Sequence, residues 1–357
     1  MMSTHSPLLA LLLWTTTSAA QDTLNHIDDA DCNCFQTNGS SGAYFSNHLF
    51  LDFRSLAQYA GVPPLVQHDS NTSSTQVTSA YFSSSKWTNS WSIQSWNNSA
   101  SLGTDSSDAT IPMTNSPQNI YIDADGDTTH LTLRTSRSPS LQSAAELEST
   151  ASNYHHLSVR MYARTRGSPG ACTAMFTYRD VETSLADVQE ADIEFLTAGP
   201  VDRIQYTNQP SFTAEGDDVE GASQNASLPN GLGWDDWAVH RLDWTPGKTT
   251  WYIDGEEVWA TGFQAPRDPA RVLFNAWSDG GSWSGEMEEG GQAMLEIRWI
   301  EMLYNTTDTR DGTCEVVCSV DKGDQVGQAV KLSAAASIFE WILVRVLVVL
   351  IGMVLAV

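Results

Sequence analysis

Three carboxylates, Glu190, Asp192 and Glu194, alternate with apolar residues in one short segment of the chain. Side chains alternate between the two faces of a strand, so on a strand all three acids would point one way and their apolar neighbours the other. Like charges about 7 Å apart on one face repel, which raises the pKa of at least one of them. This spacing suits carboxyl groups that must divide into an acid and a base.

Cleavage of a glycosidic bond needs such a pair: one carboxylate attacks the anomeric carbon, and a protonated carboxyl group donates to the leaving oxygen. In retaining enzymes the two groups lie about 5 to 5.5 Å apart, whereas Glu190 and Glu194 on a flat strand are about 13 Å apart at Cα. The strand must therefore curve, and Asp192 lies where it can hydrogen-bond the nucleophile. Two other interpretations stay open on spacing alone, an acidic strand edge facing solvent and a cation site.

The motif Glu-x-Asp-x-Glu at 190–194 follows an apolar run at 170–178 and precedes Gln-Tyr-Thr-Asn at 205–208. Together these segments resemble glycoside hydrolase family 16, whose members are retaining β-glucanases and wall transglycosylases built on a lectin-like sandwich. The resemblance implies that Glu190 is the nucleophile, that Asp192 assists it and that Glu194 is the acid/base. It implies the five-residue form of the motif, without an inserted bulge residue.

The resemblance extends over residues 119–304. Asp-Trp-Thr-Pro-Gly, which starts at Asp243 and leads to Trp-Tyr-Ile-Asp-Gly, looks like the paired strands that follow the catalytic strand of the family. Asn-Ala-Trp-Ser at 275–278 is similar to the late strand that lines its cleft. One position departs: many members have a His a few residues before the Asp-Trp pair, where this chain has Ala238, with His240 displaced. No role is therefore assigned to His240.

Many short alternating segments separated by Gly, Pro and Asn turns are typical of an all-β sandwich. Asp254-Gly255 is a strong signal for a two-residue hairpin. The acidic connection 123–127 resembles only the front of a calcium loop, so we expect a polar turn and no metal. The predicted fold is one concanavalin A-like β-sandwich (jelly roll) over residues 21–320, whose curved sheets form a glycan cleft. We expect strands at 119–122, 130–134, 156–163, 171–178, 203–207, 237–244, 249–253, 271–277 and 294–303.

A glycan cleft needs aromatic rings for the C–H faces of sugars and polar side chains for their hydroxyls. The chain has 13 Trp, which could line a cleft or fill the core. We predict substrate contacts for Trp277 and Trp283, which flank a Gly-Gly turn, and for Tyr206 and Asn208, just beyond the acidic segment.

The chain carries 43 acidic and 18 basic residues, a formal charge of −25. This excess argues against nucleic acid or an anionic membrane surface as the partner. Neutral polysaccharide remains, and we expect β-glucan as the substrate, with chitin as a further acceptor. We expect a monomer that needs no cofactor.

The N-terminus predicts export. Residues 1–20 have an apolar core and end in small residues, Ser18 and Ala20, in the positions that a signal peptidase reads. Five Asn-x-Ser/Thr sequons agree with a secreted glycoprotein, and every one that is used must lie on the surface. The predicted glycosylation sites are Asn38, Asn71, Asn97, Asn225 and Asn305.

Five cysteines remain after removal of the signal peptide. Four of them form two close pairs near the chain ends, Cys32/Cys34 and Cys314/Cys318. In an oxidising compartment one pair is the natural disulfide partner of the other, which would connect the N-terminal segment to the C-terminal strand, although the sequence leaves the connectivity open. A zinc site is the alternative for these four, with unusual spacing. Cys172 lies in a buried-strand pattern and is predicted to be a packed free thiol.

The C-terminus carries a second targeting signal. The apolar tail 337–357 is interrupted by Glu340 and Arg345, and a charge in a spanning helix costs about 2.5 to 3.5 kcal/mol. A short apolar tail after small residues is the pattern of a GPI-attachment signal. We expect the attachment point in the linker 321–336. The alternative is a C-terminal membrane helix. Either places the protein at the cell surface or wall.

The sequence thus predicts a retaining glycosidase or transglycosylase that acts on β-1,3 and/or β-1,4 glucan outside the cell, in remodelling or breakdown of a wall. The alternative is a non-catalytic lectin of the same fold, which has no need of three crowded carboxylates. A third possibility is a calcium-dependent adhesion module.

Overall fold

The computed structural model describes residues 26–67, 76–104, 107–179, 188–213, 217–308 and 313–332 of the 357-residue chain. The predicted signal peptide, the sequon at Asn71 and the apolar tail lie outside these residues. Within the described part, every helix is too short or too polar to span a bilayer.

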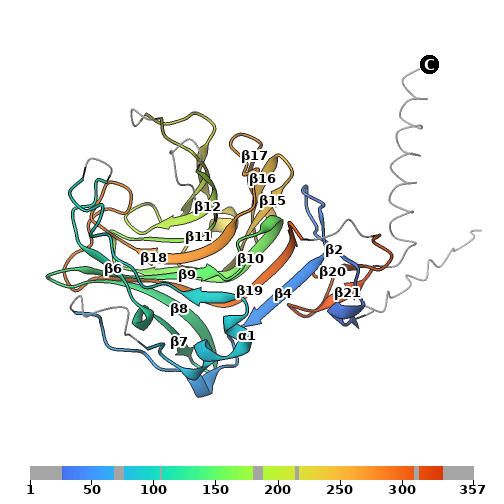
Figure 1. Ribbon diagram of the computed structural model, residues 1–357, viewed down its shortest axis with the longest axis horizontal. Helices are drawn as coiled ribbons and strands as arrows, with labels where there is room; N and C mark the ends of the chain where they lie inside the picture. The colour runs from blue at the N-terminus through green and yellow to red at the C-terminus, as the bar shows by residue number, and fades with distance from the viewer. Residues whose placement is uncertain are drawn as a thin grey trace, which may run out of the picture.

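Two curved β-sheets lie against each other and form the body of the molecule (Figure 1). The sheet that holds the acidic segment, called the front sheet here, is antiparallel and has the strand order β14-β13-β12-β11-β18-β9, with β5 beside β9. Its strands are β5 (Trp91–Ile93), β9 (Gln142–Ser149), β11 (Cys172–Arg179), β12 (Gln189–Leu196), β13 (Arg203–Gln209), β14 (Ser223–Ser227) and β18 (Arg271–Trp277).

The back sheet has the order β17-β16-β15-β10-β19-β8, with β4 beside β19 and β7 beside β8. A short pairing of β8 with β9 joins the two sheets at one edge, and β6 (Met113–Asn115) runs parallel to β9. The strands of the back sheet are β4 (Asn47–Asp52), β7 (Ile120–Asp125), β8 (Thr128–Arg137), β10 (Tyr154–Gly167), β15 (Ala238–Thr245), β16 (Lys248–Ile253), β17 (Glu256–Thr261) and β19 (Gln292–Thr306).

The helical segments of the described chain are single turns in connections between strands. They are α1 (Ser85–Thr88) and the 3-10 turns η1 (Asp29–Asp31), η2 (Ala57–Tyr59), η4 (Ala80–Ser83), η5 (Pro117–Asn119) and η7 (Pro229–Gly231). The fold is therefore the all-β jelly-roll sandwich that the sequence predicts.

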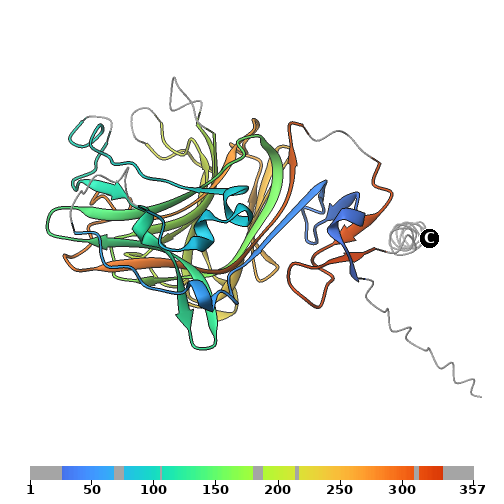
Figure 2. The ribbon, with the colours of Figure 1, turned by 60° about the horizontal axis from the view of Figure 1, so that its bottom comes forward.

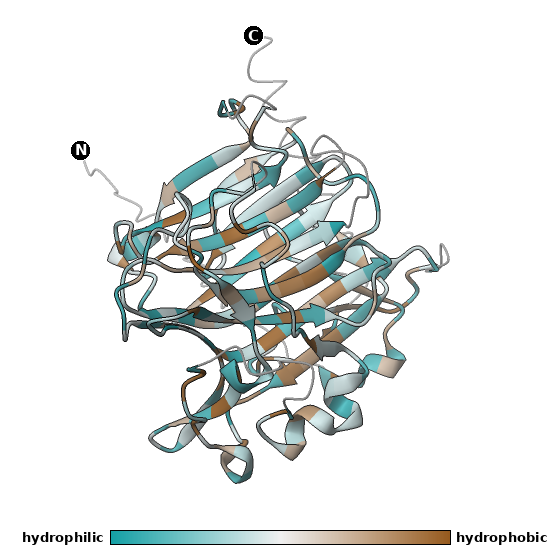
Figure 3. Cartoon of the chain, turned by 60° about the vertical axis from the view of Figure 1, so that its left-hand side comes forward, coloured by the Kyte–Doolittle hydropathy of each residue, from teal (hydrophilic) through white to brown (hydrophobic). Residues whose placement is uncertain are grey.

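The core fills the space between the sheets with the inward-facing residues of each strand. Apolar and polar residues alternate along the strands, as the banding in Figure 3 shows. On β12 the buried residues Ala191, Ile193 and Phe195 belong to this core, and Trp244 and Trp251 are buried in it from the back sheet. The acids of β12 therefore face outward, away from the core.

Most predicted strands are confirmed, with ends displaced by a few residues. The hairpin at Asp254-Gly255 is also confirmed: both residues have positive φ, 48° and 82°, and Ile253 pairs with Glu256. These angles are typical of the turn that an Asp-Gly pair favours. The segment 123–127 is part of the β7–β8 hairpin, in which Asp125 pairs with Thr128.

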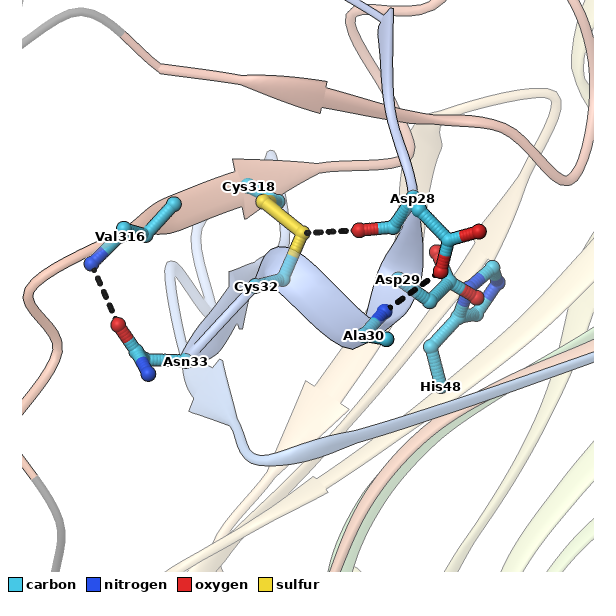
Figure 4. Close-up of a disulfide and its surroundings, with 8 residues drawn as sticks. All are labelled: Asp28, Asp29, Ala30, Cys32, Asn33, His48, Val316 and Cys318. Carbon is cyan, nitrogen blue, oxygen red and sulfur yellow. Dashed lines mark hydrogen bonds and ion pairs between the residues drawn. A yellow bond between two sulfur atoms is a disulfide. The ribbon is translucent and has the colours of Figure 1, made fainter.

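A second, small sheet lies at one end of the sandwich and is built from both ends of the described chain (Figure 2). Two disulfides connect these ends, Cys32–Cys318 (Figure 4) and Cys34–Cys314. The predicted partnership of the outer cysteines is confirmed, and the zinc alternative is excluded for them. The strands of the small sheet, in spatial order, are β1 (His26–Ile27), β21 (Ala329–Lys331), β20 (Val317–Ser319), β2 (Cys34–Gln36) and β3 (Tyr44–Phe45).

The small sheet corrects one predicted boundary. Strand β21 lies inside the segment 321–336 that the sequence predicted to be a linker. Asp321 is largely buried and pairs with Arg160 of β10. The chain is therefore folded beyond residue 320, because β21 pairs with β1 and β20 in the small sheet that the disulfides cross-link.

Candidate active site

Strand β12 places all three predicted acids on the outer face of the front sheet. Ala191, Ile193 and Phe195 alternate with the acids and are fully buried in the core. Their burial determines that the acids face outward. Asp192 is only 2% exposed, whereas Glu190 and Glu194 are half-buried. Both glutamates can therefore meet a ligand on this face of the sheet, with Asp192 between them.

The neighbouring strands complete this face in register. On β13, Gln205 is paired with Glu194, and Thr207 is paired with Asp192. On the other side, β11 pairs Ala174 with Glu194, Phe176 with Asp192 and Tyr178 with Glu190, so the smallest of these three side chains lies beside Glu194. The acids thus have polar side chains on one side, and an alanine and two aromatic side chains on the other.

Glu194 is held by two donors from distant parts of the chain. The indole Nε1 of Trp283 donates to its Oε1 at 2.8 Å, and the thiol Sγ of Cys172 donates to the same oxygen at 3.5 Å. Burial raises the pKa of Glu194 to about 7, although both hydrogen bonds act to lower it. A carboxyl group with this pKa can donate a proton near neutral pH and take one back.

Glu190 and Asp192 titrate together. Burial raises the pKa of Glu190 to about 7, interaction with Asp192 lowers it, and the charge of Glu194 raises it. Burial, followed by the charges of both glutamates, raises the pKa of Asp192 far above its ordinary value. Asp192 therefore retains a proton that it can direct at Glu190, which favours the ionised form of Glu190.

A cavity of about 250 Å³ opens on the same face, two strands away from the acids. Asn275 of β18 lies on the cross-strand row of Glu194, with Glu146 of β9 next on that row. Trp277 also lines the cavity, and Trp96 Nε1 donates to Glu146 Oε1 at 2.9 Å. Two indoles and several polar side chains in one cavity match the requirements of a sugar.

Two of the predicted substrate contacts lie on the wrong face of the sheet. Tyr206 is 1% exposed and packs in the core with its ring centroid 5.7 Å from that of Trp251. Asn208 is fully buried and donates to Thr249 Oγ1 at 2.6 Å and to the Phe263 carbonyl at 2.9 Å. Neither can reach a ligand above the acids, because the face of β13 that meets the acids carries Gln205 and Thr207 instead.

The other two predicted contacts, Trp277 and Trp283, lie near the acids, and their contact with substrate stays a prediction. Trp277 lines the cavity, and Trp283 contacts Glu194 directly. Sequence reasoning missed Cys172 as a neighbour of Glu194, and it missed Trp96, Glu146 and the side of β13 that faces the acids. The alternation of Ile204 and Tyr206 with Gln205 and Thr207 was an available signal for the last of these.

His240 lies beneath the acid strand, in the core. It is fully buried, and its ring meets Phe195 edge-on with centroids 4.9 Å apart. Burial lowers the pKa of His240 to about 4, so the ring stays neutral. Its place is that of a packing residue on the far side of β12, and it has no access to the face of the acids.

The described residues contain no cluster of three or more His, Cys, Asp or Glu side chains arranged to hold a metal ion. The sequons at Asn38, Asn97 and Asn225 have exposed side chains, and Asn305 is half-buried.

The family model for glycosyl hydrolases family 16 matches residues 107–301, more than half of the chain. The matched segment contains β12 and most of the cavity lining, but neither Trp96, Asn98 and Ser101 of that lining nor the small sheet.

Individual relatives match shorter segments. A beta-glucanase from Paenibacillus polymyxa is 25% identical over 164 residues, 44% of this chain and 63% of that protein. The Crh-like protein UTR2 of Candida albicans is 28% identical over 154 residues, 40% of this chain and 28% of that protein. The solved structure of a Bacillus licheniformis beta-glucanase is 20% identical with a TM-score of 0.44, covering 61% of this chain and 93% of that one. The chain thus spans less than two thirds of each of these two curated relatives.

Proposed function

This chain belongs to glycosyl hydrolases family 16, and we propose that it is a retaining glycosidase or transglycosylase that acts on β-glucan outside the cell. The observation that carries the proposal is the buried acid strand. It gathers three carboxyl groups on one face of the sheet, two of them with a pKa near 7 and one that keeps its proton. A surface that only binds sugar has no use for groups whose ionisation is this costly.

In the first step, ionised Glu190 attacks the anomeric carbon, and the electrons of the glycosidic bond move to the leaving oxygen. Glu194 transfers its proton to that oxygen as the bond breaks. Asp192 donates its proton toward Glu190 before the attack and so holds the nucleophile as a carboxylate. The product is a glycosyl ester on Glu190 with inverted configuration.

In the second step Glu194, now ionised, takes a proton from the acceptor hydroxyl, which attacks the anomeric carbon and releases Glu190. The second inversion restores the original configuration. A pKa near 7 suits both roles of Glu194, because the protonated and the ionised form are then both populated near neutral pH.

The acceptor decides between hydrolysis and chain transfer. Phe212 is 45% exposed, and its ring meets that of Trp283 edge-on with centroids 6.4 Å apart. This places an accessible aromatic surface next to the acid/base, where an acceptor sugar must lie. We assign Trp277 and Trp96 to the sugars on the side of the cavity, through stacking on their rings.

The cellular setting rests on the sequence. The predicted signal peptide, the sequons and the apolar tail support a secreted glycoprotein at the cell surface or wall, held by a GPI anchor. The two disulfides support an oxidising compartment. With β-glucan as substrate, this setting fits remodelling or breakdown of wall polysaccharide, with chitin as a further acceptor.

The substitution Glu190→Gln tests the proposal. It keeps the shape of the side chain and removes the nucleophile, so release of reducing ends from laminarin and lichenan should fall by at least about a thousandfold. Retention of the variant on the immobilised glucan should be unchanged. Glu289→Gln, at an exposed position, is the matched control and should keep full activity.

Two results would count against the proposal. Full activity of the Glu190 variant would remove the nucleophile assignment. A wild-type protein that binds glucan but releases neither reducing ends nor transfer products would favour a lectin.

A further inference from the structure

Cys172 is the free cysteine of the described chain, at the start of β11, and it is fully buried. The other four cysteines of the chain form the two disulfides at the small sheet. The sequence predicts a thiol that only packs. Its surroundings are more specific than packing requires.

The register of the front sheet brings the thiol to the acid/base. Cys172 is paired with Leu196 on one side and with Trp277 on the other, and Ala174, the next residue on the same face, is paired with Glu194. The Sγ–Oε1 distance to Glu194 is 3.5 Å, shorter than the 3.9 Å to the Thr173 carbonyl, the other acceptor of the thiol.

Both donors to Glu194 use the same carboxyl oxygen. Trp283 Nε1 lies 2.8 Å from Oε1, and the thiol approaches that same atom. An oxygen that accepts two hydrogen bonds acts as the carbonyl oxygen of a neutral carboxyl group, so the acidic proton must be on Oε2. The two contacts thus select which oxygen of Glu194 exchanges a proton with the substrate.

The thiol is suited to this task because it stays protonated. Burial and the charge of Glu194 raise the pKa of Cys172 well above its ordinary value. It therefore remains a donor, and it adds no charge to a site that already holds three carboxyl groups.

We propose that Cys172 is a positioning residue that, together with Trp283, fixes Oε1 of Glu194 and leaves Oε2 as the oxygen that protonates the leaving group. This inference rests on the proposed glycosidase function and extends it to a residue that does not touch the substrate. A thiol that only fills space is the competing account.

Other ionisable groups share this face, and the test must separate them from Glu194. On β12 itself they are Asp192 and Glu190, and on β13 Arg203 lies on the same face, one alternate position beyond Gln205. The groups from the other neighbouring strands are Tyr178 on β11, Arg271 on β18, and Glu146 and Glu148 on β9.

The first experiment uses the wild-type protein. With four cysteines in disulfides, the S–H stretching band in a Raman spectrum reports on Cys172 alone. Titration of Glu194 turns its carboxyl group into a stronger acceptor, so the band should shift to lower frequency as the pH rises through about 7. The same titration of Glu194→Gln should show no shift, which separates Glu194 from the other acids. A band that does not move with pH in the wild type would overturn the proposal.

The second experiment compares Cys172→Ala with Cys172→Ser, which retains a donor. Natural glucan has a poor leaving group that needs the acid, whereas a dinitrophenyl glycoside has a leaving group that does not. For Cys172→Ala, kcat/KM on natural glucan should fall about 3- to 10-fold, the size expected for one weak hydrogen bond, while the dinitrophenyl glycoside is little affected. The basic limb of the pH profile should move to higher pH, and Cys172→Ser should restore both.

Equal losses on both substrates with an unmoved pH profile would show that the thiol only packs. If Cys172→Ala does not fold, Trp283→Phe removes the other donor outside the strand and should move the same limb in the same direction; an unmoved limb would overturn the shared role. A wild-type protein inactive on both substrates would refute the proposed function, whereas the Raman result stands independently of turnover.

Discussion

Glu194→Gln should stabilise the protein at pH 8 and leave its stability at pH 4 nearly unchanged. Burial raises the pKa of Glu194 from 4.5 to about 7, so between these values the folded protein binds more protons than the unfolded chain. Stability therefore falls as the pH rises through this window. Gln carries no charge at any pH, and its side-chain oxygen can still accept from Trp283.

The size of the effect follows from the same pKa. Raising it from 4.5 to about 7 corresponds to at most about 3 kcal/mol at pH 8. Glu194 is half-buried and keeps contact with solvent, which screens its charge. We therefore expect a gain of about 1 to 2 kcal/mol, or about 2 to 8 °C in melting temperature for a domain of this size.

The assay is thermal or urea unfolding, followed by tryptophan fluorescence at pH 4, 6 and 8. Glu289→Gln, an exposed site, controls for the general loss of one negative charge from a chain of formal charge −25. The difference between Glu194→Gln and wild type should grow with pH, and that of the control should stay flat. A difference that is equal at pH 4 and pH 8 would refute the account of a costly buried carboxylate.

Three further predictions test the surroundings of the acids. Asp192→Ala removes the proton donor that lowers the pKa of Glu190, so the acidic limb of the kcat/KM profile should move to higher pH. Asp192→Asn should return the limb to its wild-type position. An unmoved limb in Asp192→Ala would exclude Asp192 as the donor to Glu190. Gln205→Ala should lower kcat/KM by about 5- to 10-fold through loss of one hydrogen bond to substrate. Tyr206→Phe, on the core face, should leave kcat/KM unchanged. A loss of kcat/KM in Tyr206→Phe but not in Gln205→Ala would contradict the register of β13. Reduction and alkylation of the two disulfides, which connect residues 286 and 280 positions apart, should lower the free energy of unfolding by about 2 to 5 kcal/mol in urea titrations; an unchanged midpoint would show that the small sheet holds without them.

The sequence was sufficient for features that depend on local pattern. Alternation along β12 placed the three acids on one face, because the apolar residues between them must be buried. The Asp254-Gly255 hairpin follows from turn chemistry alone, and export chemistry sufficed to select the outer cysteines as disulfide partners. These are short-range rules, and the structure satisfies them.

Features that depend on cross-strand register were beyond the sequence. Cys172 and Trp283 lie 22 and 89 positions from Glu194 in the chain, and only the pairing of β11 with β12 and the path of the loop after β18 bring them together. Strand β9, which joins the sheets, was not predicted, because its small and polar residues lack an apolar alternation, yet most of them are buried.

Tyr206 and Asn208 show a different failure, in which chemistry outweighed pattern. Tyrosine and asparagine are typical sugar contacts, and that preference led to the choice of these two residues. Ile204, Tyr206 and Asn208 are two residues apart and therefore lie on the same, buried face of β13. The side-chain amide of Asn208 donates a hydrogen bond to Thr249 there. Strand parity is the stronger guide when the two disagree, because a buried strand cannot rotate one residue out of its face.

The division of roles between Glu190 and Glu194 is tested most directly by trapping the covalent intermediate. A 2-deoxy-2-fluoro laminaribioside with an activated leaving group slows the second step more than the first, so the glycosyl ester should accumulate and be found by peptide mass spectrometry on Glu190. The product released from natural glucan should keep its anomeric configuration. An ester on Glu194 or Asp192, or a product of inverted configuration, would contradict the mechanism.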